Sequence, residues 1–203
     1  MSKRPTHART AEITRKTAET SVRVALDLDG AGSSSIRTGV GFFDHMLDLL
    51  ARHSLMDLVV EAEGDLAVDA HHTVEDVGIV LGQALDKAVG DKRGIFRYGW
   101  AIVPMDESLA QVAVDLSGRS AFVYRATFSG QSIGTFPAEL VEEFWKAVAC
   151  NARMNLHIQV PYGSNNHHIA EAIFKAAAKA LRQAVSPDPR NRGVPSTKGT
   201  LSQ

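Results

Sequence analysis

Cysteine is nearly absent from this chain, which has a single one, Cys150, among 203 residues. A lone cysteine cannot form a disulfide within the chain, and this favours a protein of a reducing compartment. The shortage of thiolates also means that any metal site must use nitrogen and oxygen ligands. Long apolar runs are lacking as well, since none approaches the roughly 20 residues that a membrane-spanning helix requires. We therefore expect a cytoplasmic protein that is not inserted in a membrane.

An excess of charge of one sign is missing too. The chain has 22 Lys and Arg residues against 23 Asp and Glu residues, and its formal net charge of −1 argues against nucleic-acid or membrane partners. A hydrophobic content of 44% is ordinary for a globular protein. Residues 1–10 are basic, but no apolar stretch follows them, so they are not typical of a secretory signal. We interpret residues 1–10 as a flexible basic arm.

The most informative pattern is an internal repeat. Residues 71–85 match residues 167–181 without a gap, 96 residues apart (167 minus 71), and the His-His, Glu, Ala and Leu positions coincide. Each copy is preceded by a strand-like run and, before that, by a run with apolar residues at helical spacing. The strand-like runs are 57–61 and 155–159, and the helix-like runs are 41–53 and 137–150, with Pro137 in the first helical turn. The chain is therefore predicted to be a duplication of one unit.

Further upstream, alternating apolar residues in each half indicate strands. In the first half, the strand 21–28 precedes Asp29-Gly30, which we interpret as a hairpin turn. In the second half, the strand 109–116 precedes a turn at Ser117-Gly118 and a returning strand at 121–128. The order strand, strand, helix, strand, helix predicts an α+β fold with helices on one face of each sheet. The predicted half-domains are 11–92 and 93–186, followed by a C-terminal loop or lid at 187–203.

The repeated motif, His-His-x-x-Glu, indicates metal ligands. Positions i and i+4 of a helix lie on one face, so His71 and Glu75 can bind one ion, and His167 and Glu171 can do the same. The second histidine of each pair is rotated by about 100° around the helix, which indicates a second metal position. One such motif is usually a plain surface pair, but its duplication favours metal binding. Histidine with carboxylate is compatible with Mn, Fe, Ni or Zn, and the residues do not choose among them.

A resemblance to a known family runs through these residues and covers nearly the whole chain. In residues 15–20, 43–47, 69–76, 166–175 and 195–199, the chain resembles the imidazoleglycerol-phosphate dehydratase family. The resemblance implies two similar half-domains, each a small mixed sheet with two helices on one face, in a ribosomal protein S5 domain 2-like fold. It also implies a lyase of histidine biosynthesis that dehydrates D-erythro-imidazole-glycerol phosphate to imidazole-acetol phosphate.

The resemblance further implies two Mn²⁺ ions per active site. It implies a homo-oligomer, of twenty-four subunits in this family, with active sites shared between chains. One metal would take His71, Glu75, His167 and Glu171, and the other would take His45, His72 and His168. Glu143 stands where the family often has a histidine ligand. Either the Glu143 carboxylate ligates, or the second metal has one more open position.

The anionic end of the substrate requires cations and hydrogen-bond donors. The positions that match the family's phosphate site are Arg97, Arg119, Lys175, Ser196 and Lys198. Guanidinium groups can bind phosphate through two hydrogen bonds, which suits the two arginines. The resemblance thus makes the tail, with Ser196 and Lys198, a candidate lid over the phosphate.

For the reaction, our hypothesis is a metal-bound imidazolate at a dinuclear Mn site, because no carbonyl stands next to the proton that is removed. Glu19 is the first candidate for proton transfer and for contact with the substrate, and His53 is a candidate for bonding the diol. A metal-bound Glu75 or Glu171 is a third candidate, for relaying a proton. Two alternatives stay open: a dinuclear metallohydrolase, and a non-catalytic assembly protein that is held together by metal.

Overall fold

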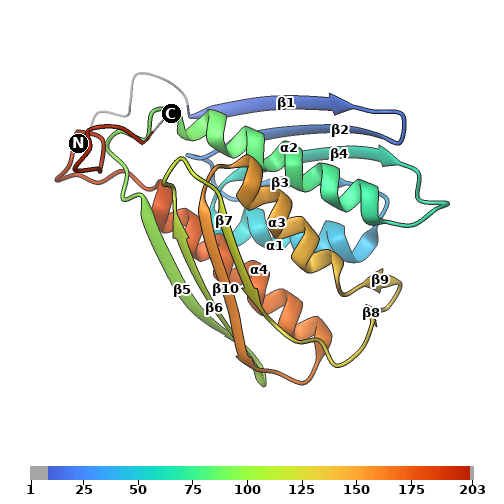
Figure 1. Cartoon of the computed structure of the whole chain (residues 1–203). Helices are drawn as coiled ribbons and strands as arrows, with labels where there is room; N and C mark the ends of the chain where they lie inside the picture. The colour runs from blue at the N-terminus through green and yellow to red at the C-terminus, as the bar shows by residue number, and fades with distance from the viewer. Residues whose placement is uncertain (1–8, 202–203) are drawn as a thin grey trace.

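The computed structural model describes residues 9–201, and Figure 1 shows two sheets with helices between them. The first half consists of β1 (Thr10–Lys16), β2 (Thr20–Asp27), β3 (Ser34–Arg37), α1 (Gly41–Ser54), β4 (Asp57–Gly64) and α2 (His71–Val89). The second half consists of β5 (Tyr98–Met105), β6 (Ser108–Asp115), β7 (Ala121–Arg125), β8 (Ser132–Ile133), β9 (Phe136–Pro137), α3 (Leu140–Asn151), β10 (Asn155–Tyr162) and α4 (Asn166–Val185). Apart from the short pair β8–β9, the two halves have the same order of elements.

Each half forms a four-stranded mixed sheet, and the strand orders β1-β2-β4-β3 and β5-β6-β10-β7 correspond strand by strand. The first two strands of each half make an antiparallel hairpin. The third strand lies parallel to the fourth, as β3 does to β4 and β7 to β10. A parallel pair requires a crossover connection, which α1 and α3 provide. The predicted α+β duplication, with a mixed sheet and two helices in each half, is confirmed.

The interpretation of Asp29-Gly30 as a hairpin turn is wrong. After β2 the chain crosses to the far edge of the sheet, where β3 pairs with β4 and not with β2. The side chain of Asp57 stabilises this connection, since its Oδ1 accepts hydrogen bonds from the backbone N–H groups of Ala31 at 2.9 Å and Ser33 at 2.8 Å. In the second half, β7 likewise pairs with β10 and does not return along β6.

Two other local predictions also need correction. Each half has one strand more than predicted, β1 in the first and β5 in the second, and both are edge strands. Their sequences hide the strand pattern, since β1 contains charged residues and β5 contains Gly99 and Pro104. Pro137 does not lie in the first turn of a helix. It pairs with Ser132 in the hairpin β8–β9, and α3 begins only at Leu140.

The helices pack across the two halves. α2 lies against α3, and α1 lies against α4, while α2 and α4 each cover the hairpin of their own sheet (Figure 1). Glycines allow the close approach of α2 and α3, since a Cβ at Gly78 would come within 2.8 Å of Ala147 and one at Gly82 within 2.7 Å of Asn151. The core therefore lies in the helix layer between the sheets, and this layer fixes which helix starts are neighbours.

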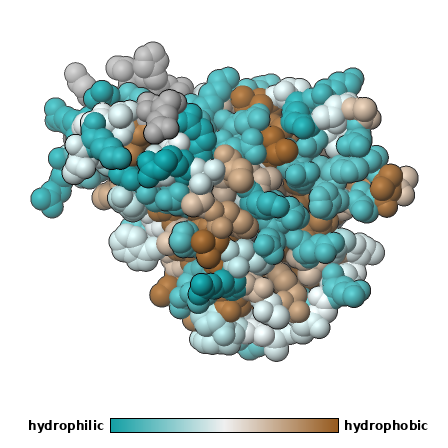
Figure 2. Space-filling model, viewed as in Figure 1, coloured by the Kyte–Doolittle hydropathy of each residue, from teal (hydrophilic) through white to brown (hydrophobic). Residues whose placement is uncertain are grey.

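The start of β1 and the described tail after α4 lie on the side of the molecule opposite to the starts of α2 and α4 (Figure 1). Most of the predicted arm, residues 1–10, lies outside the described residues, and Thr10 already begins β1. None of the described helices is long and apolar enough to cross a bilayer. Figure 2 shows a mostly hydrophilic face with small, separate apolar patches.

Candidate functional site

The start of α4 places three candidate ligands on one helix. Asn165 precedes the helix, and its side-chain oxygen accepts hydrogen bonds from the backbone N–H groups of His167 at 2.9 Å and His168 at 3.4 Å. An Asn in this position is a favoured N-cap, because it satisfies N–H groups that have no partner within the helix. The two histidines thus lie in the first turn, and Glu171 follows one turn later on the face of His167.

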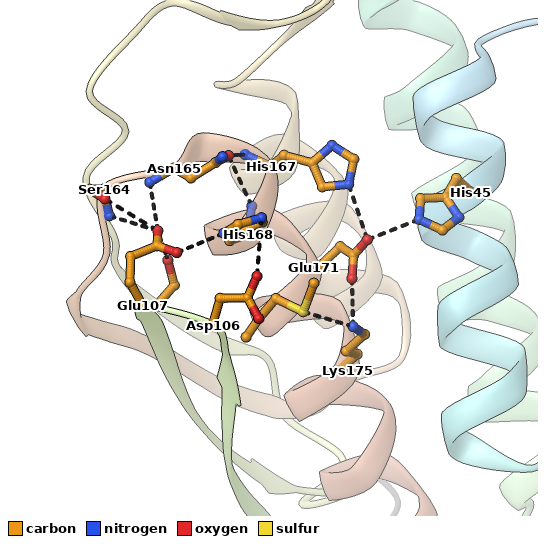
Figure 3. A network of polar contacts seen from close by, with 11 residues as sticks. His45, Asp106, Glu107, Ser164, Asn165, His167, His168, Glu171 and Lys175 are labelled. Atoms are coloured by element: carbon orange, nitrogen blue, oxygen red, sulfur yellow. Dashed lines mark hydrogen bonds and ion pairs between the residues drawn. The ribbon is translucent and has the colours of Figure 1, made fainter.

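His45, from α1, completes a compact cluster with two of these residues. Its Nε2 lies 3.1 Å from Oε1 of Glu171, and Nε2 of His167 lies 3.0 Å from the same oxygen. The candidate ligand atoms of all three residues lie within 4.8 Å of one another, and Figure 3 shows both rings directed toward the carboxylate. Two imidazole nitrogens and a carboxylate oxygen are a suitable donor set for Mn²⁺ or another divalent transition metal.

The carboxylate of this cluster is held in its charged form. Burial raises the pKa of Glu171, but hydrogen bonds from Lys175, His45 and His167 outweigh it and lower the pKa to about 2. The side chain is only 9% exposed. Lys175 bonds Oε2 of Glu171 and approaches the sulfur of Met105 at 3.2 Å. Glu171 is therefore an anion at neutral pH that can exchange its hydrogen bonds for a cation.

The matching residues of the first half lie apart from this cluster. Asp69 precedes α2 and accepts a hydrogen bond from the backbone N–H of His71 at 2.7 Å. Within residues 9–201, His45, His167 and Glu171 form the one group of three candidate metal ligands. The expected grouping of His71 and Glu75 with His167 and Glu171 is therefore not formed within one chain.

The packing of the helices explains this separation. Since α1 lies against α4 and α3 against α2, the repeat equivalent of the His45 cluster combines residues of α3 and α2. We call the first set, His45, His167, His168 and Glu171, the α1/α4 half-site. We call its repeat equivalent, Glu143, His71, His72 and Glu75, the α2/α3 half-site. In the latter, Glu143 replaces the histidine and pairs at 3.3 Å with Lys146 on its own helix.

The second histidine of each motif has a carboxylate on Nδ1. His72 Nδ1 lies 2.9 Å from Oδ2 of Asp65, and His168 Nδ1 lies 2.7 Å from Oε2 of Glu107. These hydrogen bonds raise the pKa of both histidines, and the bond from His168 lowers the pKa of Glu107. Neither Asp65 nor Glu107 was among the predicted residues. Alignment of the two hairpins could have drawn attention to Glu107, because it occupies the position of Glu19.

Glu19 lies in the turn between β1 and β2, beside the α2/α3 half-site. Its carboxylate is 58% exposed and lies 3.8 Å from Nδ1 of His72. Asp76 of α2 holds both sides of this turn, because it accepts a hydrogen bond from Arg15 at 2.8 Å and another from the hydroxyl of Thr20. This anchoring leaves the Glu19 carboxylate at the surface next to a candidate ligand, where it can reach a bound molecule.

His53 lies in the last turn of α1, within the influence of charged residues of α4. Burial lowers the pKa of His53, and the charges of Lys175 and Lys179 lower it further. The imidazole is therefore held neutral near pH 7, when it can accept as well as donate a hydrogen bond.

Most of the predicted phosphate residues lie at the opposite end of the second sheet. Arg97 precedes β5, whereas the turn with Glu107 follows it, and eight residues of strand span about 26 Å at roughly 3.3 Å each. Arg97 has a positive φ of 69° and bonds Asp115 at 2.6 Å and the backbone oxygen of Pro195 at 2.7 Å. Three further predicted residues lie in the segments beside this end: Arg119 after β6, and Ser196 and Lys198 in the tail. Only Lys175 lies at the α1/α4 half-site.

Comparisons with known proteins point to one family. The family model described as imidazoleglycerol-phosphate dehydratase (IGPD) matches residues 38–181. A protein of that name from Acidiphilium cryptum is 58% identical to this chain, and the match covers 96% of this chain and 100% of the relative. One from Rhodopirellula baltica is 54% identical, and the match covers 96% of each protein.

Solved structures agree. The imidazoleglycerol-phosphate dehydratase of Staphylococcus aureus superposes with a TM-score of 0.80 at 44% identity, covering 88% of this chain and 99% of its own. The IGPD of Pyrococcus furiosus, in complex with (S)-C348, also superposes with a TM-score of 0.80, at 35% identity. This match covers 93% of the present chain and 99% of the Pyrococcus furiosus chain. With its duplicated fold and the His45 cluster, the chain belongs to the imidazoleglycerol-phosphate dehydratase family.

Proposed function

We propose that this protein dehydrates D-erythro-imidazole-glycerol phosphate to imidazole-acetol phosphate in the biosynthesis of histidine. The observation that carries the proposal is the cluster of His45, His167 and Glu171 in a chain whose relatives bear the name of this dehydratase. Since the duplicated chain has a second, equivalent set of ligands, we propose two Mn²⁺ ions per active site. When bound, these ions would supply Lewis-acid activation of the imidazole ring of the substrate.

We propose that each active site is completed by neighbouring copies of the chain. The α1/α4 half-site lies apart from the α2/α3 half-site, and four of the five predicted phosphate residues lie at the far end of the second sheet. A substrate with an imidazole at one end and a phosphate at the other is only a few carbon atoms long. One chain therefore does not place both groups of residues within its reach, whereas a symmetric assembly can.

Exposed apolar side chains support such an assembly. Leu66 and Val68 lie on the loop before α2, and they are 40% and 71% exposed. Trp100 and Ile102 lie on the edge strand β5 and are 64% and 63% exposed. Large apolar residues grouped on a surface are typical of contacts between proteins. The closed homo-oligomer of twenty-four subunits that the family resemblance implies would cover them, and we propose that it operates in the cytoplasm.

The chain's own residues then have distinct tasks. The dehydration removes a proton from one carbon and a hydroxyl from its neighbour, so one group must accept the first proton and another must protonate the leaving oxygen. Glu19 is exposed beside His72 and is our first candidate for proton transfer. His53, held neutral, is the candidate for bonding the diol. Arg97, Arg119, Ser196 and Lys198 of another copy would bind the phosphate, with the tail as a lid.

A turnover assay with and without metal tests this proposal. The purified protein is treated with a chelator, and formation of imidazole-acetol phosphate is then measured before and after addition of Mn²⁺. We expect turnover to be lost and then restored. Undiminished turnover in metal-free protein would contradict the metal mechanism. Release of phosphate from simple esters would favour a metallohydrolase, and metal-dependent assembly without turnover would favour a structural protein.

A further inference from the structure

Both His-His-x-x-Glu motifs have the same arrangement around their second histidine, built from different parts of the fold. Asp65, in the loop between β4 and α2, lies on Nδ1 of His72. Glu107, in the hairpin turn between β5 and β6, lies on Nδ1 of His168. The duplication does not account for this similarity, because the repeat equivalent of Glu107 is Glu19, 88 residues earlier (107 minus 19), and not Asp65.

The chemistry of this contact fixes the role of each ring nitrogen. An ionised carboxylate only accepts hydrogen bonds, so Nδ1 of the histidine must carry the proton. A neutral ring then has its free lone pair on Nε2, which is the nitrogen that can bind a cation. We propose, on the basis of the proposed function, that Asp65 and Glu107 are positioning residues that prepare Nε2 of His72 and His168 to ligate the metals.

Glu107 has a second task that shows how firmly it is held. Its Oε1 accepts hydrogen bonds from the backbone N–H groups of Asn165 at 2.8 Å and Ser164 at 3.2 Å, just before α4 begins (Figure 3). It also accepts one from the hydroxyl of Ser108 at 3.0 Å. One oxygen of Glu107 thus holds the start of the helix, and the other oxygen orients the ring of His168.

This division between two oxygens permits a sharp test. In Glu107→Gln, the amide oxygen can still accept from the backbone before α4, but the amide NH₂ faces Nδ1 of His168 and can only donate. The ring must then carry its proton on Nε2, where it blocks metal binding. Both oxygens of Asp65 lie near Nδ1 of His72, at 2.9 and 3.2 Å, so an amide there could still present its oxygen to the ring. Asp65→Ala therefore removes the contact with His72. Ser164→Ala is the matched control, because it removes a hydroxyl that lies 3.3 Å from Oε1 of Glu107 and leaves the contact with His168 intact.

The measurement is the dissociation constant of Mn²⁺ for the full-length chelator-treated protein, together with its metal-free melting temperature. Loss of a partner that orients a metal-bound histidine weakens metal binding by about 10- to 100-fold. We expect that loss in Glu107→Gln and in Asp65→Ala, with melting temperatures close to that of the parent protein. Ser164→Ala should bind Mn²⁺ within about twofold of the parent, since that contact does not reach the metal-binding nitrogen.

Three outcomes separate this inference from the proposed function. If the parent binds Mn²⁺ and both Glu107→Gln and Asp65→Ala bind it equally well, the inference fails and the proposed function stands. A fall in metal affinity that is matched by Ser164→Ala would assign Glu107 a purely structural role and also overturn the inference. A parent protein that binds no Mn²⁺ overturns the inference and the proposed function together.

Discussion

Glu19 and Glu107 occupy the same place in the two halves, the end of the first hairpin turn, yet their surroundings differ. Glu107 bonds the start of α4 and the ring of His168, whereas Glu19 is more exposed and lies 3.8 Å from His72. In the first half Asp65 has taken over the contact with the histidine. One repeat thus uses this glutamate to orient His168, and the other leaves it exposed beside His72.

The two half-sites also differ in how many of their candidate ligands contact one another. In the α1/α4 half-site His45 and His167 share one carboxylate, so three donors already converge. In the α2/α3 half-site Glu143 replaces the histidine and bonds Lys146 instead. One half-site is therefore assembled within the chain. In the other, the candidate ligands do not converge within the described residues.

The largest effect should come from breaking the assembled half-site. Glu171→Gln removes the anion to which both histidines converge, and we expect the turnover number to fall by about 1,000-fold, because metal activation contributes several kcal/mol and each 1.36 kcal/mol is tenfold. Steady-state assays at saturating Mn²⁺ measure this. Glu75→Gln is the equivalent change in α2, and a normal rate in either variant would contradict the metal assignment.

A smaller effect, on binding rather than on chemistry, should follow at the far end of the second sheet. Arg119→Ala removes a predicted phosphate contact, and hydrogen bonds to charged groups contribute about 1.5–3 kcal/mol, so KM should rise by about 10- to 100-fold. Mn²⁺ affinity should stay unchanged, since a residue that binds the phosphate ligates no metal. A variant with parental KM would remove Arg119 from the phosphate site.

The difference at Glu143 can be reversed by substitution. Glu143→His restores the ligand that the family often has and makes the α2/α3 half-site resemble its partner, so turnover should stay within about threefold of the parent. Glu143→Ala should weaken Mn²⁺ binding by about tenfold if the carboxylate ligates. Equal Mn²⁺ affinity of the parent and Glu143→Ala would show that this position contributes no ligand.

The smallest effect concerns acid stability of the metal-free protein. The pKa of Glu171 is lowered in the fold, so its contribution to stability is present above its unfolded value near 4.5 and is lost as pH falls toward about 2. Melting temperatures between pH 5 and pH 2.5 should fall less steeply in Glu171→Gln than in the parent. Parallel curves for the two proteins would mean that these hydrogen bonds do not favour the charged form.

The duplication, the fold class and the ligand-bearing helices could be predicted because one sequence pattern occurs twice and helical spacing sets His167 over Glu171. The edge strands β1 and β5 could not be predicted, because neither has a clear apolar alternation. Charged residues interrupt it in β1, and Gly99 and Pro104 interrupt it in β5. The partner of each half-site depends on which helices pack together, and that is a tertiary property. Alignment of the two hairpins marks Glu107 as the counterpart of Glu19, but its contact with His168 appears only in the structure.

The most direct test of the account asks whether one active site draws residues from different chains. Glu171→Gln and Arg119→Ala chains with different tags are expressed together, and assemblies that contain both are purified. They are assayed at a substrate concentration well below the KM of the parent, where a raised KM also lowers the rate. Because these residues lie at separate parts of one chain, we predict turnover well above that of either variant alone, from sites that receive intact residues of both chains. Mixed assemblies no more active than the two separate variants would contradict the account.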